Sequence, residues 1–143
     1  MTKSTILSFF GAAAAALFGG WDGAMMTLAI FILIDYISGV VLACVFKKST
    51  KTKNGKLDSR AGLIGLCRKV GMFVMVIVAQ RLDDLCGMGG VLRTGVIFAL
   101  VANEALSIVE NLGLMGLPLP EALMQAIEQL HGKSKTDNNN SEE

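Results

Sequence analysis

The stretch GAMMTLAIFILIDYISGVVLACVF, residues 23–46, decides how the rest of the chain is interpreted. Asp35 is the only charged residue in this stretch. At ~1.5 Å per residue, a helix of this length is about 36 Å long, which exceeds the roughly 30 Å hydrocarbon core of a bilayer. Its large apolar side chains each favour insertion by roughly 0.3 to 0.6 kcal/mol, against a cost of about 3 kcal/mol for a central Asp. Residues 23–46 are therefore predicted to cross a membrane.

The composition of the whole chain indicates the same environment. The 143 residues are 52% hydrophobic and 17% charged, with a mean hydropathy of +0.56, which is too apolar for an ordinary soluble domain. A net charge of +1 argues against a nucleic-acid partner. One His and the widely spaced Cys44, Cys67 and Cys86 form no recognisable metal site or disulfide framework. No nucleophile or phosphate-binding motif is present, so we expect a non-enzymatic protein without cofactors whose partner is membrane lipid.

Three further apolar stretches lie at residues 5–21, 62–82 and 91–112. The first is short and alanine-rich, and with Lys3 before it the segment also fits a cleavable signal peptide. The other two carry charges that make each of them marginal as an isolated span. The expected fold class is all-α: a polytopic membrane protein with about four transmembrane helices, which together form a domain over residues 1–117.

The orientation follows from the loop at residues 47–60, which holds six Lys and Arg against one Asp. The positive-inside rule places this loop in the cytoplasm. With four crossings, both termini are then cytoplasmic and Cys86 is outside. An alternative has three crossings, with residues 58–69 lying in the membrane interface as an amphipathic helix.

The carboxyl-terminal part of the chain differs in character from the apolar stretches. After Pro118 and Pro120, apolar residues recur at helical spacing, which predicts a short amphipathic cytoplasmic or interfacial helix within residues 118–132. His131 is interpreted as a helix-end residue. Residues 133–143 contain no large apolar side chain and are predicted to be disordered.

Charged residues inside three of the apolar stretches fall at similar depths. Counted at ~1.5 Å per residue from each cytoplasmic helix end, Asp35 lies roughly 16 Å deep, Lys69 roughly 10 Å and Glu104 roughly 12 Å. Arg68 lies beside Lys69. Buried charges in a membrane need partners of opposite sign, so these residues are predicted to form an intramembrane charge layer.

A polar stripe follows the same helix as Glu104. Asn103 and Ser107 are four residues apart, and Glu110 and Asn111 continue at spacings of three and four, so the four residues share one helix face. Such a stripe either packs against polar partners or faces water. A chain this small has little protein to cover it, so we expect homo-oligomerisation, with the stripe between helices or lining a pore.

Small residues predict where helices approach closely. Gly39 and Ala43 are a small-xxx-small pair in the second stretch, and Gly62 and Gly65 begin the third. Small side chains allow the backbones of membrane helices to come together. These four positions are therefore predicted to be helix-packing sites.

Five segments resemble the phage holin family that includes the clostridial toxin-secretion holins, a group also known as holin family 4. The segments are DYISG (35–39), GLIGLCRK (62–69), Leu82 with Asp83, NEALSIVEN (103–111) and LPLPEAL (117–123). Together they span most of the chain from Asp35 to about Leu130. The NEALSIVEN run is the most specific of them, and it contains the polar stripe.

The resemblance implies a phage or prophage protein of the bacterial cytoplasmic membrane. Such a protein accumulates harmlessly, oligomerises and then opens timed lesions through which an endolysin, or in some relatives a toxin, crosses the membrane. On this hypothesis the charge layer closes the silent state, and rearrangement exposes the stripe to a water-filled lumen. Two alternatives remain from the residues alone: a small ion channel or transporter subunit, and an antiholin that regulates another holin.

Overall fold

The computed structural model describes residues 2–126 and residue 129. In chain order its elements are α1 (Lys3–Phe18), α2 (Gly23–Val41), the π-helical turn η1 (Leu42–Phe46), α3 (Ser59–Cys86) and α4 (Val91–Leu114). The described residues contain no strand, so the predicted all-α class is confirmed.

Three helical segments are long and apolar enough to cross a membrane: Gly23–Phe46, Ser59–Cys86 and Val91–Leu114. α1 is shorter, with 16 residues, so a fourth crossing stays a prediction. The three-crossing alternative assigned residues 58–69 to a separate interfacial helix. In the structure, residues 59–69 are instead the first part of the continuous helix α3, which is one of the three long apolar segments. α1 is the apolar helix that is too short to be counted among them.

The helix ends differ from the predicted boundaries for local reasons. The first stretch was expected to continue to residue 21, but α1 ends at Phe18 because Gly19 and Gly20 adopt positive φ angles of 71° and 102°. The third stretch was expected at residues 62–82, and α3 is longer at both ends. Asp58 caps its start by accepting a hydrogen bond from the Arg60 N–H at 3.0 Å, and its end is set by Gly87 at φ 65°.

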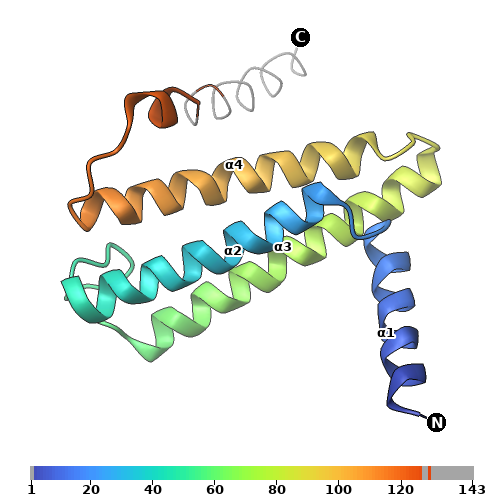
Figure 1. The fold of residues 1–143 in the computed structure, drawn as a ribbon, viewed down its shortest axis with the longest axis horizontal. Helices are drawn as coiled ribbons and strands as arrows, with labels where there is room; N and C mark the ends of the chain where they lie inside the picture. Colours follow the sequence, from blue (N-terminus) through green and yellow to red (C-terminus); the bar gives the residue numbers. More distant parts are fainter. Residues whose placement is uncertain (1, 127–128, 130–143) are drawn as a thin grey trace.

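The three long helices lie side by side, with α2 and α4 running in one direction and α3 in the other (Figure 1). α2 packs most extensively against α4. The apolar core of the body is a cluster of six buried side chains, called the apolar cluster below: Met25, Leu28, Ile32, Val76, Ile97 and Leu100. It occupies the half of the bundle where α2 and α4 begin.

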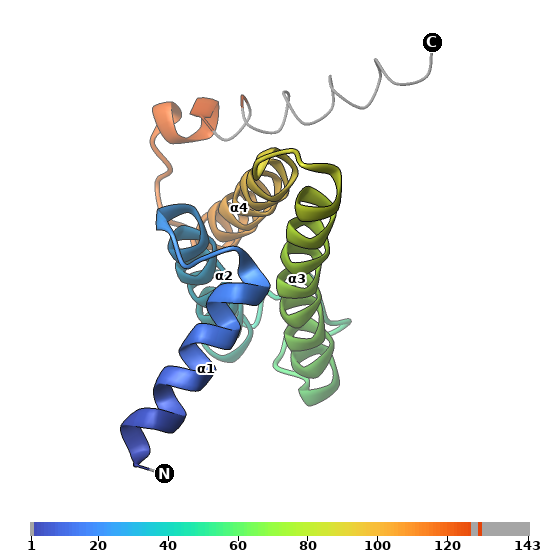
Figure 2. The same cartoon turned by 90° about the vertical axis from the view of Figure 1, so that its right-hand side faces the viewer.

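α1 runs crosswise to the three-helix body in both views (Figures 1 and 2). It leaves the body at the end where α2 and α4 begin, and it packs against α3 near its own carboxyl end. Residues 5–21, expected as the first of four crossings, therefore do not run alongside α2, α3 and α4.

The carboxyl-terminal segment turns back after α4, and residues 121–126 are helical. This short helix lies within the predicted amphipathic segment at residues 118–132. His131 and the predicted disordered tail at residues 133–143 lie outside the described residues.

Candidate functional site

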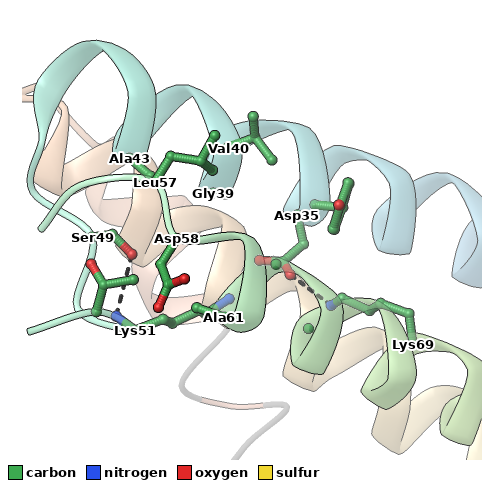
Figure 3. Close-up of a pocket in the computed structure, with 14 residues that line it drawn as sticks. Asp35, Gly39, Val40, Ala43, Ser49, Lys51, Leu57, Asp58, Ala61 and Lys69 are labelled. Atoms are coloured by element: carbon green, nitrogen blue, oxygen red, sulfur yellow. Dashed lines mark hydrogen bonds and ion pairs between the residues drawn. The ribbon is translucent and has the colours of Figure 1, made fainter.

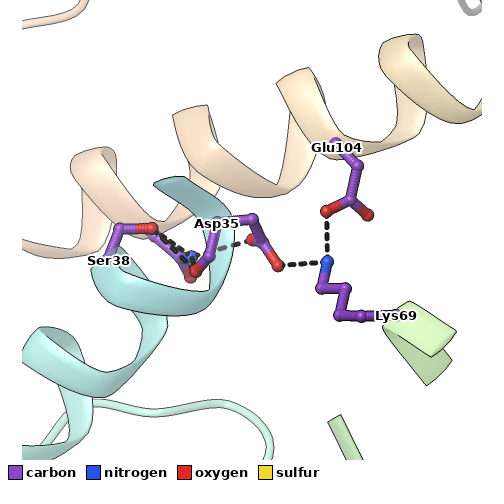
Figure 4. Close-up of polar contacts among 5 residues, drawn as sticks. Asp35, Ser38, Lys69 and Glu104 are labelled. Atoms are coloured by element: carbon purple, nitrogen blue, oxygen red, sulfur yellow. Dashed lines mark hydrogen bonds and ion pairs between the residues drawn. The ribbon is translucent and has the colours of Figure 1, made fainter. Parts of the chain in front are cut away.

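One lysine joins carboxylates from two other helices in the middle of the bundle. The Nζ atom of Lys69 on α3 lies 2.6 Å from Oδ2 of Asp35 on α2, and it also donates to Oε2 of Glu104 on α4 (Figure 4). Asp35 and Glu104 are each 1% exposed, and Lys69 is 9% exposed. The three residues, called the charge triad below, link all three long helices at one depth.

The second oxygen of Asp35 is occupied by a small hydrogen-bond network. The side-chain amide of Asn111 donates to Asp35 Oδ1 at 3.2 Å and to Ser38 Oγ at 2.9 Å. The Ser38 hydroxyl in turn donates to the main-chain carbonyl of Asp35 at 3.0 Å. Both oxygens of Asp35 are therefore hydrogen-bonded, which a buried carboxylate requires.

The charge triad carries an unequal number of charges. Two carboxylates share one ammonium group, so the fully ionised triad has a net charge of −1. Arg68, predicted to belong to the same layer, is exposed and makes no ion pair among the described residues. The layer seen in the structure is thus smaller than the predicted one.

A cleft of about 850 Å³ leads from the loop at residues 47–60 to the charge triad. Arg60 and Arg68 on α3 lie along one of its sides, and Asn103, Ser107 and Glu110 on α4 lie along the other. Asp35, Lys69 and Glu104 also line it. Because most of the residues that line the cleft are charged or polar, this half of the bundle is suited to hold water.

The predicted polar stripe is divided in the structure. Asn103 and Glu110 are exposed and Ser107 is half-buried, and all three line the cleft. Asn111 is buried instead, because it turns toward α2 and its partners Asp35 and Ser38. The stripe therefore combines a cleft-lining part with one inter-helix contact inside the chain.

The four predicted packing positions line a smaller pocket of about 60 Å³ between α2 and α3 (Figure 3). Ala43 is buried, and a Cβ atom placed on Gly39 would lie 3.7 Å from the Asn111 amide nitrogen. A Cβ atom placed on Gly62 or Gly65 would have no neighbouring atom within 4 Å. Among the residues that the structure describes, these two glycines make no close helix contact, and contact between chains stays a prediction.

Sequence reasoning missed a second polar cluster at the opposite end of the bundle. Arg93, near the start of α4, is only 6% exposed. Its guanidinium donates to the main-chain carbonyls of Phe18 and Gly20 and to Asp22 Oδ2, the last at 2.7 Å. Arg81 on α3 donates to the carbonyl of Ala16. We call these contacts the arginine clamp.

Carboxylates complete the clamp from both sides. Asp83 accepts hydrogen bonds from the N–H groups of Leu92, at 3.1 Å, and Arg93, at 2.6 Å, so a residue of α3 caps the start of α4. Asp22 caps α2 by accepting from Met25 N–H at 2.9 Å. The hydrogen bond from Arg93, aided by that from Met25, holds the pKa of Asp22 below its ordinary value of 3.8.

One sequence signal could have revealed the clamp. A cation in the first turn of a helix faces the positive end of the helix dipole, which is unfavourable unless a specific partner compensates. Arg93 lies three residues after Gly90, the N-cap of α4, so its position predicts such a partner. Its main partners, however, are carbonyl groups, which every residue type carries.

Comparison with known proteins identifies the family. The family model described as the bacteriophage holin family matches residues 12–132. The chain belongs to the bacteriophage holin family. The match covers all three spans and the charge triad, so the predicted resemblance is confirmed.

Individual relatives agree with this membership. A protein of Bacillus phage phi105 named a probable holin is 37% identical over 91 residues, which are 64% of this chain and 62% of the relative. An uncharacterised protein of Clostridium perfringens is 37% identical over 127 residues, 88% of each chain. One from Halalkalibacterium halodurans is 40% identical over 126 residues, 85% of this chain and 87% of the relative. No solved structure matches the chain.

The family and the apolar helices together make this a membrane-inserted protein. Holin family membership also points to a non-enzymatic role. Among the described residues, no group of three or more His, Cys, Asp or Glu side chains could hold a metal ion.

Proposed function

We propose that this protein is a holin that oligomerises in the bacterial cytoplasmic membrane and opens timed lesions there. The lesions release an endolysin, or a toxin, and no chemical reaction is catalysed. The observation that carries the proposal is the charge triad: a holin family member with three apolar spans keeps three ionisable groups buried at one depth. Such groups are costly in a membrane and mark functional positions by default.

In the proposed silent state the triad holds the three spans together. The positive charge of Lys69 compensates one of the two carboxylates. The remaining negative charge stays in the middle of the bundle, beside the apolar cluster. Opening separates the helices, and the released charges and the stripe residues Asn103, Ser107 and Glu110 then face a water-filled lumen between subunits.

The two halves of the bundle suit a voltage-dependent trigger. The cleft brings polar surface from the cytoplasmic loop to the triad, while the apolar cluster fills the other half. The membrane potential then falls mainly across the apolar half. One elementary charge that crosses the full potential changes the free energy by about 2.3 kcal/mol per 100 mV, so depolarisation favours a rearrangement of the triad.

Orientation and partners complete the proposal. The basic loop at residues 47–60 lies in the cytoplasm, and with α2, α3 and α4 as spans the carboxyl terminus is cytoplasmic as well. The partners are further copies of this chain, membrane lipid and, functionally, an endolysin or secreted toxin encoded elsewhere.

The decisive experiment is induced expression in a bacterium that carries a cytosolic endolysin. Membrane potential and release of a folded cytosolic reporter protein are recorded together. We expect a silent lag, then abrupt depolarisation with release of the reporter and lysis. Depolarisation with the reporter retained would contradict the proposal of large lesions.

A small ion channel is the second candidate, because the cleft already reaches halfway through the bundle and ends at charged groups. It predicts ion flux without protein release in the same experiment. An antiholin would instead stay silent alone and delay lysis when expressed with an active holin.

A further inference from the structure

α1 differs from the three spans in length and direction. Its 16 residues make a helix of about 24 Å, which is shorter than the hydrocarbon core of a bilayer. Both views show its axis crosswise to α2, α3 and α4 (Figures 1 and 2). When α2, α3 and α4 are aligned with the membrane normal, α1 therefore lies along the membrane surface.

One narrow side of α1 is small and polar, and the side opposite to it is apolar. Ser4, Ser8 and Gly11 follow one another at spacings of four and three and share one side. Ile6, Phe10 and Leu17 recur at spacings of four and seven on the opposite side. All six residues are exposed in the chain, so protein covers neither face. The exposed Leu7 and Phe9 lie between the two sides, so the apolar surface of α1 is broad and its polar side is narrow. A short helix of this kind fits against lipid with its polar side toward the headgroups.

The arginine clamp fixes the depth of α1. Arg81 and Arg93 hold the carbonyls of Ala16 and Phe18, the last turn of α1, against α3 and α4. Phe18 also packs edge to face on Phe73 of α3, with ring centroids 6.0 Å apart. This end of the helix is thereby anchored at the level where α2 begins.

Trp21 indicates that this end of the bundle lies at a membrane surface. It lies between α1 and α2 and is 51% exposed. Tryptophan is enriched at membrane–water interfaces, where its ring meets apolar chains and its N–H meets polar groups. Because the basic loop places the opposite end of the bundle in the cytoplasm, this surface is the outer one.

We propose that α1 is an interfacial helix that binds the lipid surface of the outer leaflet, with its Ile6 and Phe10 side toward the acyl chains. The amino terminus then lies outside, in place of the cytoplasmic position expected for four crossings. This inference rests on the orientation of the proposed function, but it does not depend on lesion formation.

Cysteine accessibility in intact spheroplasts tests the side of the membrane. Thr2→Cys is introduced into a chain whose Cys44, Cys67 and Cys86 are replaced by Ser, and a membrane-impermeant maleimide is added. Two controls carry a single cysteine each: one retains only Cys86, expected outside, and one carries only Asn54→Cys, expected in the cytoplasm.

We expect Thr2→Cys to react to the same extent as Cys86, while Asn54→Cys reacts only after the membrane is permeabilised. Protection of Thr2→Cys with both controls as expected would overturn the interfacial helix and leave the proposed function intact. If the two controls exchange sides, the orientation is wrong, and the assignment of α1 to the outer leaflet fails while lesion formation is still decided by the lysis experiment.

Depth provides an independent measurement on purified protein in vesicles. Phe10→Trp, made in a Trp21→Phe background, reports the middle of α1 through quenching by lipids brominated at shallow or deep acyl positions. We expect shallow quenching, in contrast to Leu33→Trp on the exposed face of α2. Quenching of Phe10→Trp at the same depth as Leu33→Trp would overturn the proposal, because a spanning α1 places Phe10 near the bilayer centre.

Discussion

The charge triad and the arginine clamp solve the same problem by different means. Lys69 and Arg93 are both buried cations in a membrane protein, with 9% and 6% of their surfaces exposed. Lys69 meets side-chain carboxylates from two other helices. Arg93 mostly meets main-chain carbonyls, with Asp22 as its one ion-pair partner in the described chain.

The position of each cation along the helices explains the difference. In the middle of a helix every carbonyl is already used by the helical hydrogen-bond ladder, so a buried cation there needs acidic side chains. The last carbonyls of a helix are free, and they carry the negative end of the helix dipole. A cation at such an end can therefore be satisfied by backbone alone.

The largest expected effect comes from removing the central cation of the triad. Lys69→Met leaves Asp35 and Glu104 buried without a counter-charge, and breaking a buried pair in this way costs about 3 kcal/mol or more. We expect a large loss of thermal stability in detergent, measured by circular dichroism. Arg68→Met, the matched control at the exposed neighbour, should change little. Equal losses in the two variants would show that the triad is not a mutually neutralising unit.

The second prediction concerns lysis timing. Glu104→Gln and Asp35→Asn each replace the net negative triad by one neutral ion pair. This lowers the free-energy cost of keeping these side chains buried in the silent state. A stabilisation of about 1 kcal/mol lowers the population of the open state roughly fivefold, so the lag before lysis should lengthen. The control is Glu121→Gln, at an exposed residue beyond α4. An unchanged lag in both triad variants would rule out the role given to the triad.

The third prediction concerns the arginine clamp. Arg93→Gln removes the charged donor from the carbonyls of Phe18 and Gly20 and from Asp22, and hydrogen bonds to charged groups are worth about 1.5–3 kcal/mol. We expect faster proteolysis at residues 16–22 and a loss of stability of about 2 kcal/mol. Arg81→Gln should have a smaller effect, because that side chain is half exposed. Equal sensitivity of the two variants would contradict the assignment of Arg93 as the main anchor.

The smallest effect is the pH dependence of the clamp. The pKa of Asp22 is lowered in the folded protein by Arg93 and the Met25 N–H, so its ionised form stabilises the fold above about pH 3.8. This contribution is lost as the pH falls through the lower folded value. The side chain is 51% exposed, so after solvent screening the effect should stay below about 1 kcal/mol. Thermal unfolding at pH 6 and pH 3 should show the difference from Asp22→Asn shrinking at the lower pH.

Several features could be predicted because they depend on local sequence. Hydropathy over residues 23–46 and a fixed helical rise give a span and the depth of Asp35, whatever the neighbouring helices do. The same count placed Lys69 and Glu104 near that depth, and in the structure the three side chains meet. Ser38 was not predicted as a partner of Asn111, because depth does not reveal which faces of α2 and α4 are turned together.

By itself, the sequence determined the all-α class, the apolar spans and the family, since these depend on residue types and their spacing along single helices. Only the tertiary structure decided that Lys69 is paired while Arg68 is left in the cleft, and that α1 runs crosswise to the spans. The physical reason is that pairing depends on helix rotation, and the clamp depends on free main-chain carbonyls. Neither is encoded in the identity of any one residue.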